Sequence, residues 1–347
     1  MQREIIIILL LSSAAFIFAL LWTPLWTKVL YKYKLGKTIR NSGATPIFSK
    51  LHAAKSGTPT MGGVLIWVTV LVFAIIFYYL SKFLPYNIFK ELNFLTRTET
   101  WLPLGCLVAS ALVGLFDDWL DVRGKGTAGG GGLRMLHRLM IYTAIALIGA
   151  LWFYFKLERD TFNIPFLGDF HLGWTYIIVF VFVIVATAFS VNQTDGLDGL
   201  AGGVLLTSYA AYSIISFMNG KYDLAAFCAI IIGGILAFLW FNIAPARFYM
   251  GDTGSMGLGI TLGVIAMLTD SAAILVIIGS VFVIEAFSTI LQIASKKIRG
   301  KKIFLSAPIH HHLEAIGWPE TKIVMRFWVI GGVSATIGLV IFLLNSL

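Results

Sequence analysis

The stretch ALVGLFDDWLD, residues 111–121, runs from an apolar segment suited to the interior of a lipid bilayer straight into two adjacent acids, Asp117 and Asp118. Adjacent carboxylates repel each other, and ionised side chains are costly inside a membrane, so the apolar segment should reach the membrane surface here. Acids also disfavour the C-terminal end of a helix, where the helix dipole is negative. The doubled acid therefore indicates either solvation at the interface or a bound cation.

The composition is that of a membrane protein. The chain of 347 residues is 58% hydrophobic and 12% charged, with a mean hydropathy of +0.87. Soluble domains are nearer half apolar and a quarter charged. The net charge of +9 is explained first by loops that face the cytoplasm, and we expect no nucleic acid as a partner. Such loops would also attract anionic substrates and lipids.

Several apolar runs are long enough to cross a bilayer, which takes about 20 helical residues. They do not alternate as the strands of a membrane barrel do. The sequence therefore predicts an all-α polytopic membrane protein, with residues 1–347 forming a single integral membrane domain. We expect ten transmembrane helices, at 5–26, 62–80, 101–116, 139–155, 173–190, 199–217, 224–241, 256–270, 272–291 and 326–345.

The basic residues predict the orientation of these spans. Of the 26 Lys and Arg residues, 19 lie in one alternate set of connections or at its border with the last span. Because basic loops stay in the cytoplasm, this set should be cytoplasmic, and an even number of spans then leaves both termini extracytoplasmic. The set consists of loops 27–61, 117–138, 191–198, 242–255 and 292–325.

The chemically unusual residues all fall on this cytoplasmic face. Beside Asp117 and Asp118, four stretches meet there: KSGTPTMGG (55–63), NQTDGLDGLAGG (192–203), FYMGDTGSMGLG (248–259) and APIHHHLEAIG (307–317). Each has an ordinary structural interpretation, such as a helix cap, a Pro turn with packing glycines, or an interfacial His tract. Five such segments on one face are harder to explain structurally, so we expect the active site on the cytoplasmic side.

Together these residues suit phosphoryl transfer. Carboxylates without cysteine favour a hard cation such as Mg²⁺, which proteins usually hold with one or two carboxylates plus substrate phosphates. Gly-rich turns that open a helix present free N–H groups to an anion. The lipid bilayer implies a lipid substrate. Glu285, inside the predicted span 272–291, costs about 2.5–3.5 kcal/mol there, and a structural and a catalytic supporting role both remain open.

The motifs TPTMGG, FDD, NQTDGLDGLAGG, MGDTGS and APIHHHLE, in this order along the chain, resemble the polyprenyl-phosphate N-acetylhexosamine-1-phosphate transferases. Within that family they look like the muramoyl-peptide branch. The resemblance implies Mg²⁺-dependent transfer of phospho-MurNAc-pentapeptide from UDP-MurNAc-pentapeptide to undecaprenyl phosphate. The products would be lipid I, for peptidoglycan synthesis, and UMP. It also implies a multi-pass protein of the bacterial inner (plasma) membrane, and a homodimer would fit the family.

The resemblance also implies roles for individual residues. It assigns Mg²⁺ to Asp252 with support from Asp118, and makes Asp117 the candidate that orients or deprotonates the lipid phosphate. His310 and His311 match the functional histidines of the family. Further positions, which match family residues near the nucleoside or the phosphates or lie in its motifs, are Lys55, Thr60, Asn192, Asp195, Asp198, Asn242, Tyr249 and His312.

One loop departs from the family, and two other functions compete. After DDWLD many relatives are basic, whereas this chain has Asp121 and GTAGGGG, which leaves Lys125, Arg134 and Arg138 to supply local charge.

The nearest alternative is a sister enzyme that transfers GlcNAc-1-phosphate. A transporter is less favoured, because transporter sites lie near the bilayer midplane between repeated halves, and no repeat is visible here.

Overall fold

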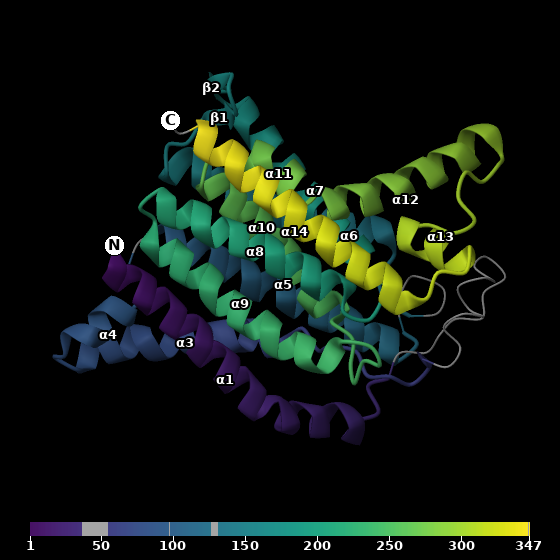
Figure 1. Cartoon of the computed structure of the whole chain (residues 1–347), viewed down its shortest axis with the longest axis horizontal. Helices are drawn as coiled ribbons and strands as arrows, with labels where there is room; N and C mark the ends of the chain where they lie inside the picture. Colours follow the sequence, from purple (N-terminus) through teal and green to yellow (C-terminus); the bar gives the residue numbers. More distant parts are fainter. Residues whose placement is uncertain (37–54, 97, 126–130, 346) are drawn as a thin grey trace.

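The computed structural model describes residues 1–347 except 37–54, 97, 126–130 and 346 (Figure 1). About half of the predicted loop 27–61 and most of the GTAGGGG run therefore lie outside the described residues. The helices are α1 Gln2–Lys32, α3 Val64–Phe83, α4 Asn87–Leu92, α5 Thr98–Val122, α6 Met135–Leu151, α7 Thr175–Thr194, α8 Leu200–Met218, α9 Tyr222–Asn242, α10 Gly251–Leu268, α11 Ala272–Ile278, α12 Ser280–Arg299, α13 Ile309–Ala315 and α14 Glu320–Asn345.

The expected polytopic helical architecture is confirmed at the level of its spans. Across the described parts of the chain, nine helices are long and apolar enough to cross a membrane, and α11 with α12 would make a tenth span. The prediction of one straight span at 272–291 is wrong, because α11 and α12 meet at an angle of 83°. The break falls at Gly279–Ser280, the kind of pair at which helices bend sharply. Hydropathy does not detect it, since the flanking residues are apolar on both sides.

Helix α10 forms the centre of the bundle. All of its residues from Gly251 to Leu268 are buried, and it packs against α5 and α7. Glycines make this close packing possible. A β-carbon at Gly259, for example, would lie 2.9 Å from the Cα of Ala188 on α7. The central position of α10 places Asp252, in its first turn, among the ends of several helices.

Three predicted boundaries are wrong in a way that matters for the site. Helix α5 continues to Val122, so Asp117 and Asp118 lie within a helix rather than in the following loop. Helix α10 begins at Gly251 instead of residue 256, and His310 lies in the short helix α13 rather than in a loop. Polar residues in terminal turns lower the local hydropathy without ending the helix, which explains these differences.

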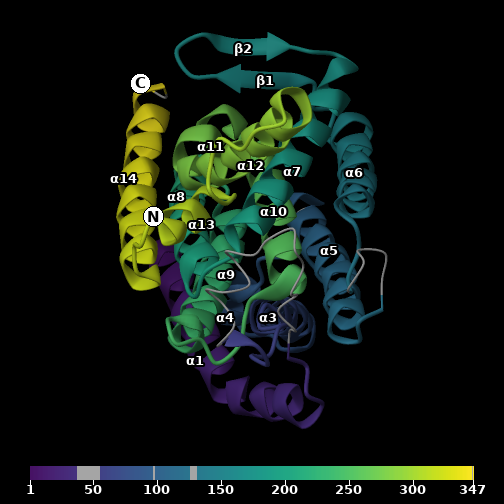
Figure 2. The same ribbon diagram turned by 90° about the vertical axis from the view of Figure 1, so that its right-hand side faces the viewer.

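A β-hairpin corrects the expectation of an all-α chain. Strands β1 (Thr161–Ile164) and β2 (Gly168–His171) pair antiparallel, with Phe162 opposite Phe170. Figure 2 shows the hairpin at the same end of the molecule as the C-terminus, and the Phe166 N–H donates to Asn345 Oδ1 at 2.7 Å. The strands have four residues each, and their turn lacks the Asn-Gly or Asp-Gly signal of a tight hairpin.

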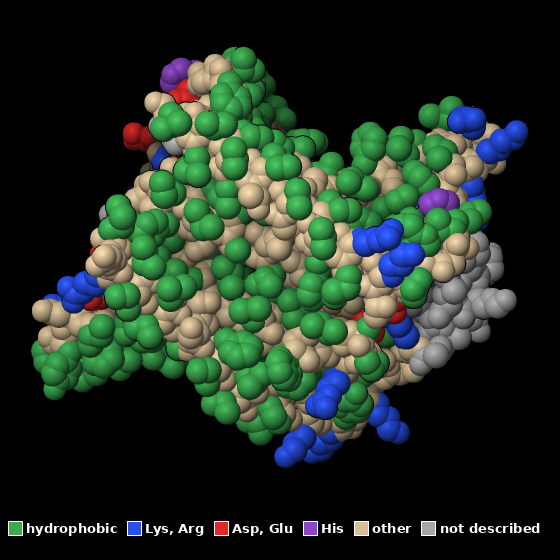
Figure 3. Space-filling model, in the orientation of Figure 1, with side chains coloured by type: hydrophobic (Ala, Val, Ile, Leu, Met, Phe, Trp, Pro, Cys, Tyr) green, Lys and Arg blue, Asp and Glu red, His purple; other side chains and the backbone are tan. Residues whose placement is uncertain are grey.

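The outer surface has the distribution expected of a protein in lipid. Hydrophobic side chains are spread over the whole face in Figure 3. Val329, Val333 and Ile337 on α14 are among the exposed hydrophobic residues. Many of the Lys and Arg side chains on this face lie toward its right and lower edges, where α12, α13 and the end of α1 are. Both termini lie away from α13, on the left of Figure 1.

Candidate active site

Two motifs nearly 190 residues apart are joined by their backbones. The Tyr249 N–H donates to Pro59 O at 2.8 Å, and the Gly62 and Gly63 N–H groups donate to the carbonyls of Tyr249 and Met250 at 2.7 and 2.8 Å. Gly63 must be glycine, because a β-carbon there would lie 2.2 Å from the Cα of Gly254. TPTMGG is therefore the segment that supports the first turn of α10.

Asp118 caps that turn from the neighbouring helix α5. Its Oδ1 accepts from the Asp252 N–H at 3.1 Å and from the Thr60 hydroxyl at 3.2 Å, and its Oδ2 accepts from the Thr253 N–H at 3.0 Å. The side chain is buried. Free N–H groups and a positive dipole at a helix start favour such a carboxylate. Gly251, with φ +74°, leaves room for it, because a β-carbon at this position would lie 2.5 Å from Asp118 Oδ2.

Arg138, near the start of α6, bridges the other two acids. Its Nε lies 2.8 Å from Asp117 Oδ2, its Nη2 lies 2.7 Å from Asp252 Oδ2, and its Nη1 donates to Asp252 Oδ1 at 3.1 Å. Asp117 is fully buried, and its Oδ1 also accepts from the Leu133 N–H at 2.6 Å. Two carboxylates from α5 and α10 thus share one guanidinium.

Asn192 completes this cluster from the end of α7. Its amide nitrogen donates to Asp252 Oδ1 at 2.6 Å and to Ser255 Oγ at 3.0 Å, while its Oδ1 accepts from Arg138 at 3.3 Å. The structure therefore brings together five of the predicted site residues, which come from four segments of the chain: Thr60, Asp117, Asp118, Asn192 and Asp252.

The carboxylates of this cluster would suit a hard cation only if other ligands completed its shell. No group of three or more His, Cys, Asp or Glu side chains in the described ranges forms a complete metal cage. Mg²⁺ usually takes only one or two protein carboxylates and completes its shell with phosphates and water. Asp252 is bonded by the side chains of Arg138 and Asn192, which can rotate away from it, whereas Asp118 is bonded by backbone N–H groups that helix α10 holds in place. Asp252 is thus the better placed of the two predicted ligands.

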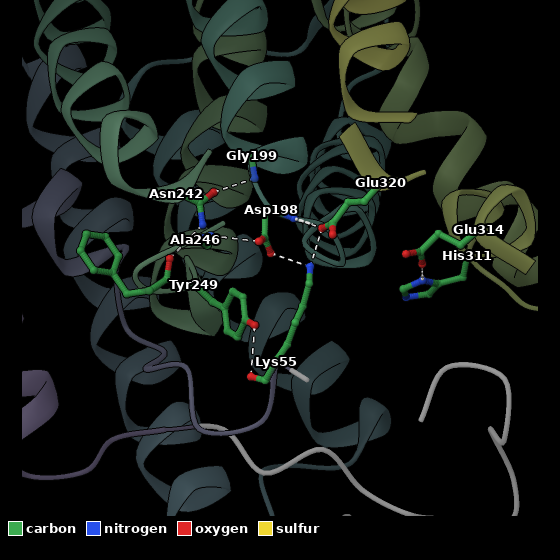
Figure 4. A network of polar contacts seen from close by, with 10 residues as sticks. Lys55, Asp198, Gly199, Asn242, Ala246, Tyr249, His311, Glu314 and Glu320 are labelled. Carbon is green, nitrogen blue, oxygen red and sulfur yellow. Dashed lines mark hydrogen bonds and ion pairs between the residues drawn. The ribbon is translucent and has the colours of Figure 1, made fainter. Parts of the chain in front are cut away.

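A second cluster surrounds Lys55. Its ammonium lies 2.8 Å from Asp198 Oδ1 and 2.5 Å from Glu320 Oε1, as Figure 4 shows. Glu320 also accepts from the Asp198 N–H at 2.8 Å, and Asp198 Oδ2 accepts from the Ala246 N–H at 3.0 Å. Burial disfavours the charged amine, but the hydrogen bonds to the two carboxylates outweigh it and raise the pKa of Lys55 above its ordinary value.

Asn242 and Tyr249 border the same cluster. Asn242 accepts from the Gly199 N–H at 2.9 Å and donates to Phe248 O at 2.9 Å, so its amide ties the turn after α7 to the segment before α10. The Tyr249 hydroxyl donates to Lys55 O at 3.4 Å, and partial burial raises the pKa of the phenol. Asn242 and Asp198 therefore shape the loops around Lys55, and their contact with a nucleotide stays a prediction.

The three consecutive histidines have three different environments. His310 Nδ1 lies 2.8 Å from Glu285 Oε2, and both side chains are fully buried. His311 Nδ1 lies 2.7 Å from Glu314 Oε2, in the part of the site shown in Figure 4. His312 accepts from the Leu305 N–H at 3.3 Å. The sequence-based interpretation as one tract is therefore too simple.

His310 also links α13 to the turn after α7. A β-carbon at Gly196 would lie 2.2 Å from His310 Nε2, so this ring edge packs directly on the TDGLDG turn. Asp195, which ends α7, is the neighbour of that glycine. The predicted residues Asp195 and His310 are thus close in space, although about 115 residues separate them in the chain.

Comparisons with known proteins assign the family. Residues 100–270 match the description Glycosyl transferase family 4, and residues 55–66 match signature 1 of the phospho-N-acetylmuramoyl-pentapeptide-transferases. A phospho-N-acetylmuramoyl-pentapeptide-transferase of Chloroflexus aggregans is 38% identical, covering 95% of this chain and 88% of the relative. One of a Geobacillus species, strain WCH70, is 36% identical over 98% of this chain and 99% of the relative. The chain belongs to the phospho-N-acetylmuramoyl-pentapeptide transferase family.

As a phosphoglycosyl transferase of this family, the chain carries the family signature on residues that build the site. The signature covers Lys55 and Thr60, and the longer match covers both acidic motifs. The resemblance inferred from the sequence is confirmed. The same comparison supports a membrane-bound transferase of peptidoglycan biosynthesis.

Sequence reasoning does not identify some residues of the candidate site. Arg138 was noted only as local charge, and Glu314 and Glu320 were not considered. Glu320 follows Pro319 at the start of α14, where an acid is expected simply as a partner of the helix dipole, so no local signal connects it with Lys55. Glu285 did carry a signal, since a charge within an apolar span is rare.

Proposed function

We propose that the protein transfers phospho-MurNAc-pentapeptide from UDP-MurNAc-pentapeptide to undecaprenyl phosphate, giving lipid I and UMP, at the cytoplasmic face of the bacterial plasma membrane. The observation that carries this proposal is the meeting of Asp117, Asp252 and Arg138 at the ends of spanning helices. A site at a helix end lets a lipid headgroup meet a water-soluble nucleotide. This position also disfavours a transporter, whose site would lie near the midplane.

The reaction exchanges one phosphoanhydride for another. An oxygen of the lipid phosphate attacks the sugar-linked phosphorus of the donor, the bond between the two phosphates breaks, and UMP leaves with the bonding electrons. Because one anhydride is lost and one is formed, no ATP is required. Catalysis then depends on positioning and on neutralising charge.

The chain supplies most of these functions through three residues. Asp117 accepts a proton from, or orients, the lipid phosphate, and Arg138 presents a planar set of donors suited to phosphate oxygens. Asp252 would hold Mg²⁺, which when bound neutralises phosphate charge. Asp118 acts indirectly, by fixing the first turn of α10 and with it the direction of Asp252.

The Lys55 cluster is proposed to hold the nucleotide end of the donor. Lys55 is a compact cation held in place by Asp198 and Glu320, so it can meet a phosphate or a uracil carbonyl. Tyr249 offers a half-buried aromatic face next to it, on which uracil can stack. The backbone pairing of residues 59–63 with 249–250 sets the distance between this cluster and Asp252.

A donor comparison tests the proposal against the sister enzyme. The purified protein in detergent, with Mg²⁺ and undecaprenyl phosphate, should release UMP from UDP-MurNAc-pentapeptide and far less from UDP-GlcNAc. A site that binds the lactyl-peptide arm leaves polar groups unpaired when that arm is missing.

Two variants make the comparison specific to the site. Asp252→Asn should abolish UMP release, whereas Asp169→Asn, on the hairpin near the C-terminus, should retain it. If UDP-GlcNAc is the better donor, the assignment moves to the GlcNAc-1-phosphate branch. Equal release by both variants would remove the acidic cluster from the reaction.

A further inference from the structure

Arg138 already occupies the carboxylate that a metal ion would use. Its Nη2 and Nη1 contact the two oxygens of Asp252 at 2.7 and 3.1 Å, while its Nε contacts Asp117 at 2.8 Å. This is a two-pronged contact on Asp252, the strongest geometry of an arginine–carboxylate pair. The Asn192 amide adds a further donor to Asp252 Oδ1 at 2.6 Å.

A divalent cation bound to Asp252 needs the same oxygens. Its charge would stand within a few ångströms of the guanidinium, and like charges at that distance repel strongly in a largely buried site. Arg138 is only 18% exposed and Asp117 is fully buried, so water screens this repulsion poorly. The guanidinium and the metal ion therefore compete for Asp252.

The net charge of the acidic cluster matches that of one divalent cation. The three carboxylates of Asp117, Asp118 and Asp252 together with the Arg138 guanidinium carry a formal charge of −2. One divalent ion balances that charge. Arg138 thus reduces the attraction for a metal ion without removing it.

We propose that Arg138 and the divalent cation exchange on Asp252. When the metal ion binds, Arg138 leaves Asp252, keeps its Nε contact with Asp117, and turns its two Nη groups to the phosphates of the substrates. Arg138 is then a positioning residue that lowers the metal affinity of the free protein and joins metal binding to phosphate binding. This inference rests on the proposed function, because it takes Asp252 as the metal ligand.

Metal binding without substrates tests the exchange. The probe is Mn²⁺, which like Mg²⁺ prefers oxygen ligands, titrated into the full chain in detergent and followed by electron paramagnetic resonance. Arg138→Gln should tighten Mn²⁺ binding about tenfold or more, because it removes a positive charge next to the ligand. Arg138→Lys keeps the charge but lacks the planar fork of donors. Its Mn²⁺ affinity should lie between those of the parent protein and Arg138→Gln.

A matched control separates competition for Asp252 from the long-range electrostatic effect of removing a nearby positive charge. Arg134→Gln removes the same charge from the N-cap of α6, one turn before Arg138 and exposed to solvent, and should change the affinity by less than about threefold. Unchanged or weaker Mn²⁺ binding in Arg138→Gln overturns the exchange, and so does an equal effect of the two glutamine variants.

A second pair of variants keeps the test valid if Arg138→Gln does not fold. Loss of Arg138 leaves buried Asp117 without its counter-charge, which is costly. Asp117→Asn and Asp117→Asn/Arg138→Gln avoid that charge, and the double variant should bind Mn²⁺ more tightly. Equal affinities of this pair overturn the exchange. A protein that binds Mn²⁺ independently of Arg138 leaves the proposed function standing. If neither the parent protein nor any of these variants binds Mn²⁺, even with both substrates added, the exchange and the proposed function are both overturned.

Discussion

Adjacent acids in FDD have different surroundings because they point to different sides of α5. Asp117 meets the guanidinium of Arg138 and the Leu133 N–H, whereas Asp118 meets the first turn of α10 and the Thr60 hydroxyl. Neighbours on a helix are about 100° apart, so one pair of acids can serve two purposes. One acid of the pair holds a cationic group, and the other caps a helix.

Asp118 should contribute to stability as well as to activity. Asp118→Ala leaves the N–H groups of Asp252 and Thr253 without their acceptor, and an unsatisfied buried group costs about 1–3 kcal/mol. We expect a clearly lower thermal midpoint in detergent, measured without substrates. Asp169→Ala, on the exposed strand β2, is the control and should leave the midpoint near that of the parent protein. Equal midpoints for the two variants would contradict the capping role.

At the scale of elements, the bend between α11 and α12 brings Glu285 into contact with His310. The bend of 83° lets α12 leave the direction of α11 and meet α13, where Glu285 contacts His310. Farther along α12, Gln292 accepts from the N–H groups of Ile303 and Phe304 and so ties down the segment that leads to α13. Both contacts hold α13 against the bundle.

Glu285 should act through His310. Glu285→Ala leaves His310 Nδ1 without its partner in a fully buried position, so we expect UMP release to fall by about tenfold or more. Glu285→Gln keeps a polar partner for His310, so its UMP release should fall less. Ile290→Ala, on an exposed position of the same helix, serves as the control, with thermal midpoints measured for all three. Activity in Glu285→Ala equal to that of the control would leave the pair without a role in the reaction.

At the scale of the whole molecule, the site and the hairpin should face opposite sides of the membrane. Nineteen of the 26 basic residues lie in the connections on the site side or at their border with the last span. In a variant with Cys106 and Cys228 replaced by Ala, the Lys301→Cys thiol should react with an impermeant reagent only from the cytoplasm. The Leu167→Cys thiol, in the hairpin turn, should react only from outside. Labelling of the Lys301→Cys variant from outside intact cells would reverse the proposed orientation.

Hydropathy, charge bias and motif spacing are enough to predict the class of the protein, most of its spans and its motif residues. Hydropathy and charge bias are properties of contiguous segments, so a run of apolar residues predicts a membrane helix wherever it packs. Motif residues such as Asp117, Asp252 and Lys55 could be picked out because their types and spacing are unusual in a membrane protein and match a family. Helix ends were less accurate, because the acids of FDD and GDTGS lie inside helices whose terminal turns are polar.

Which of these residues make contact, and through which atoms, depends on the packing of the helices. Lys55 and Glu320 are 265 positions apart, and Arg138 and Asp252 are 114 apart, yet each pair forms a direct contact. The distance in space between such residues cannot be read from the sequence, because it depends on how α5, α6 and α7 pack around α10. The division between the two acids of FDD, the sharing of Arg138 and the separate partners of the three histidines are therefore consequences of packing.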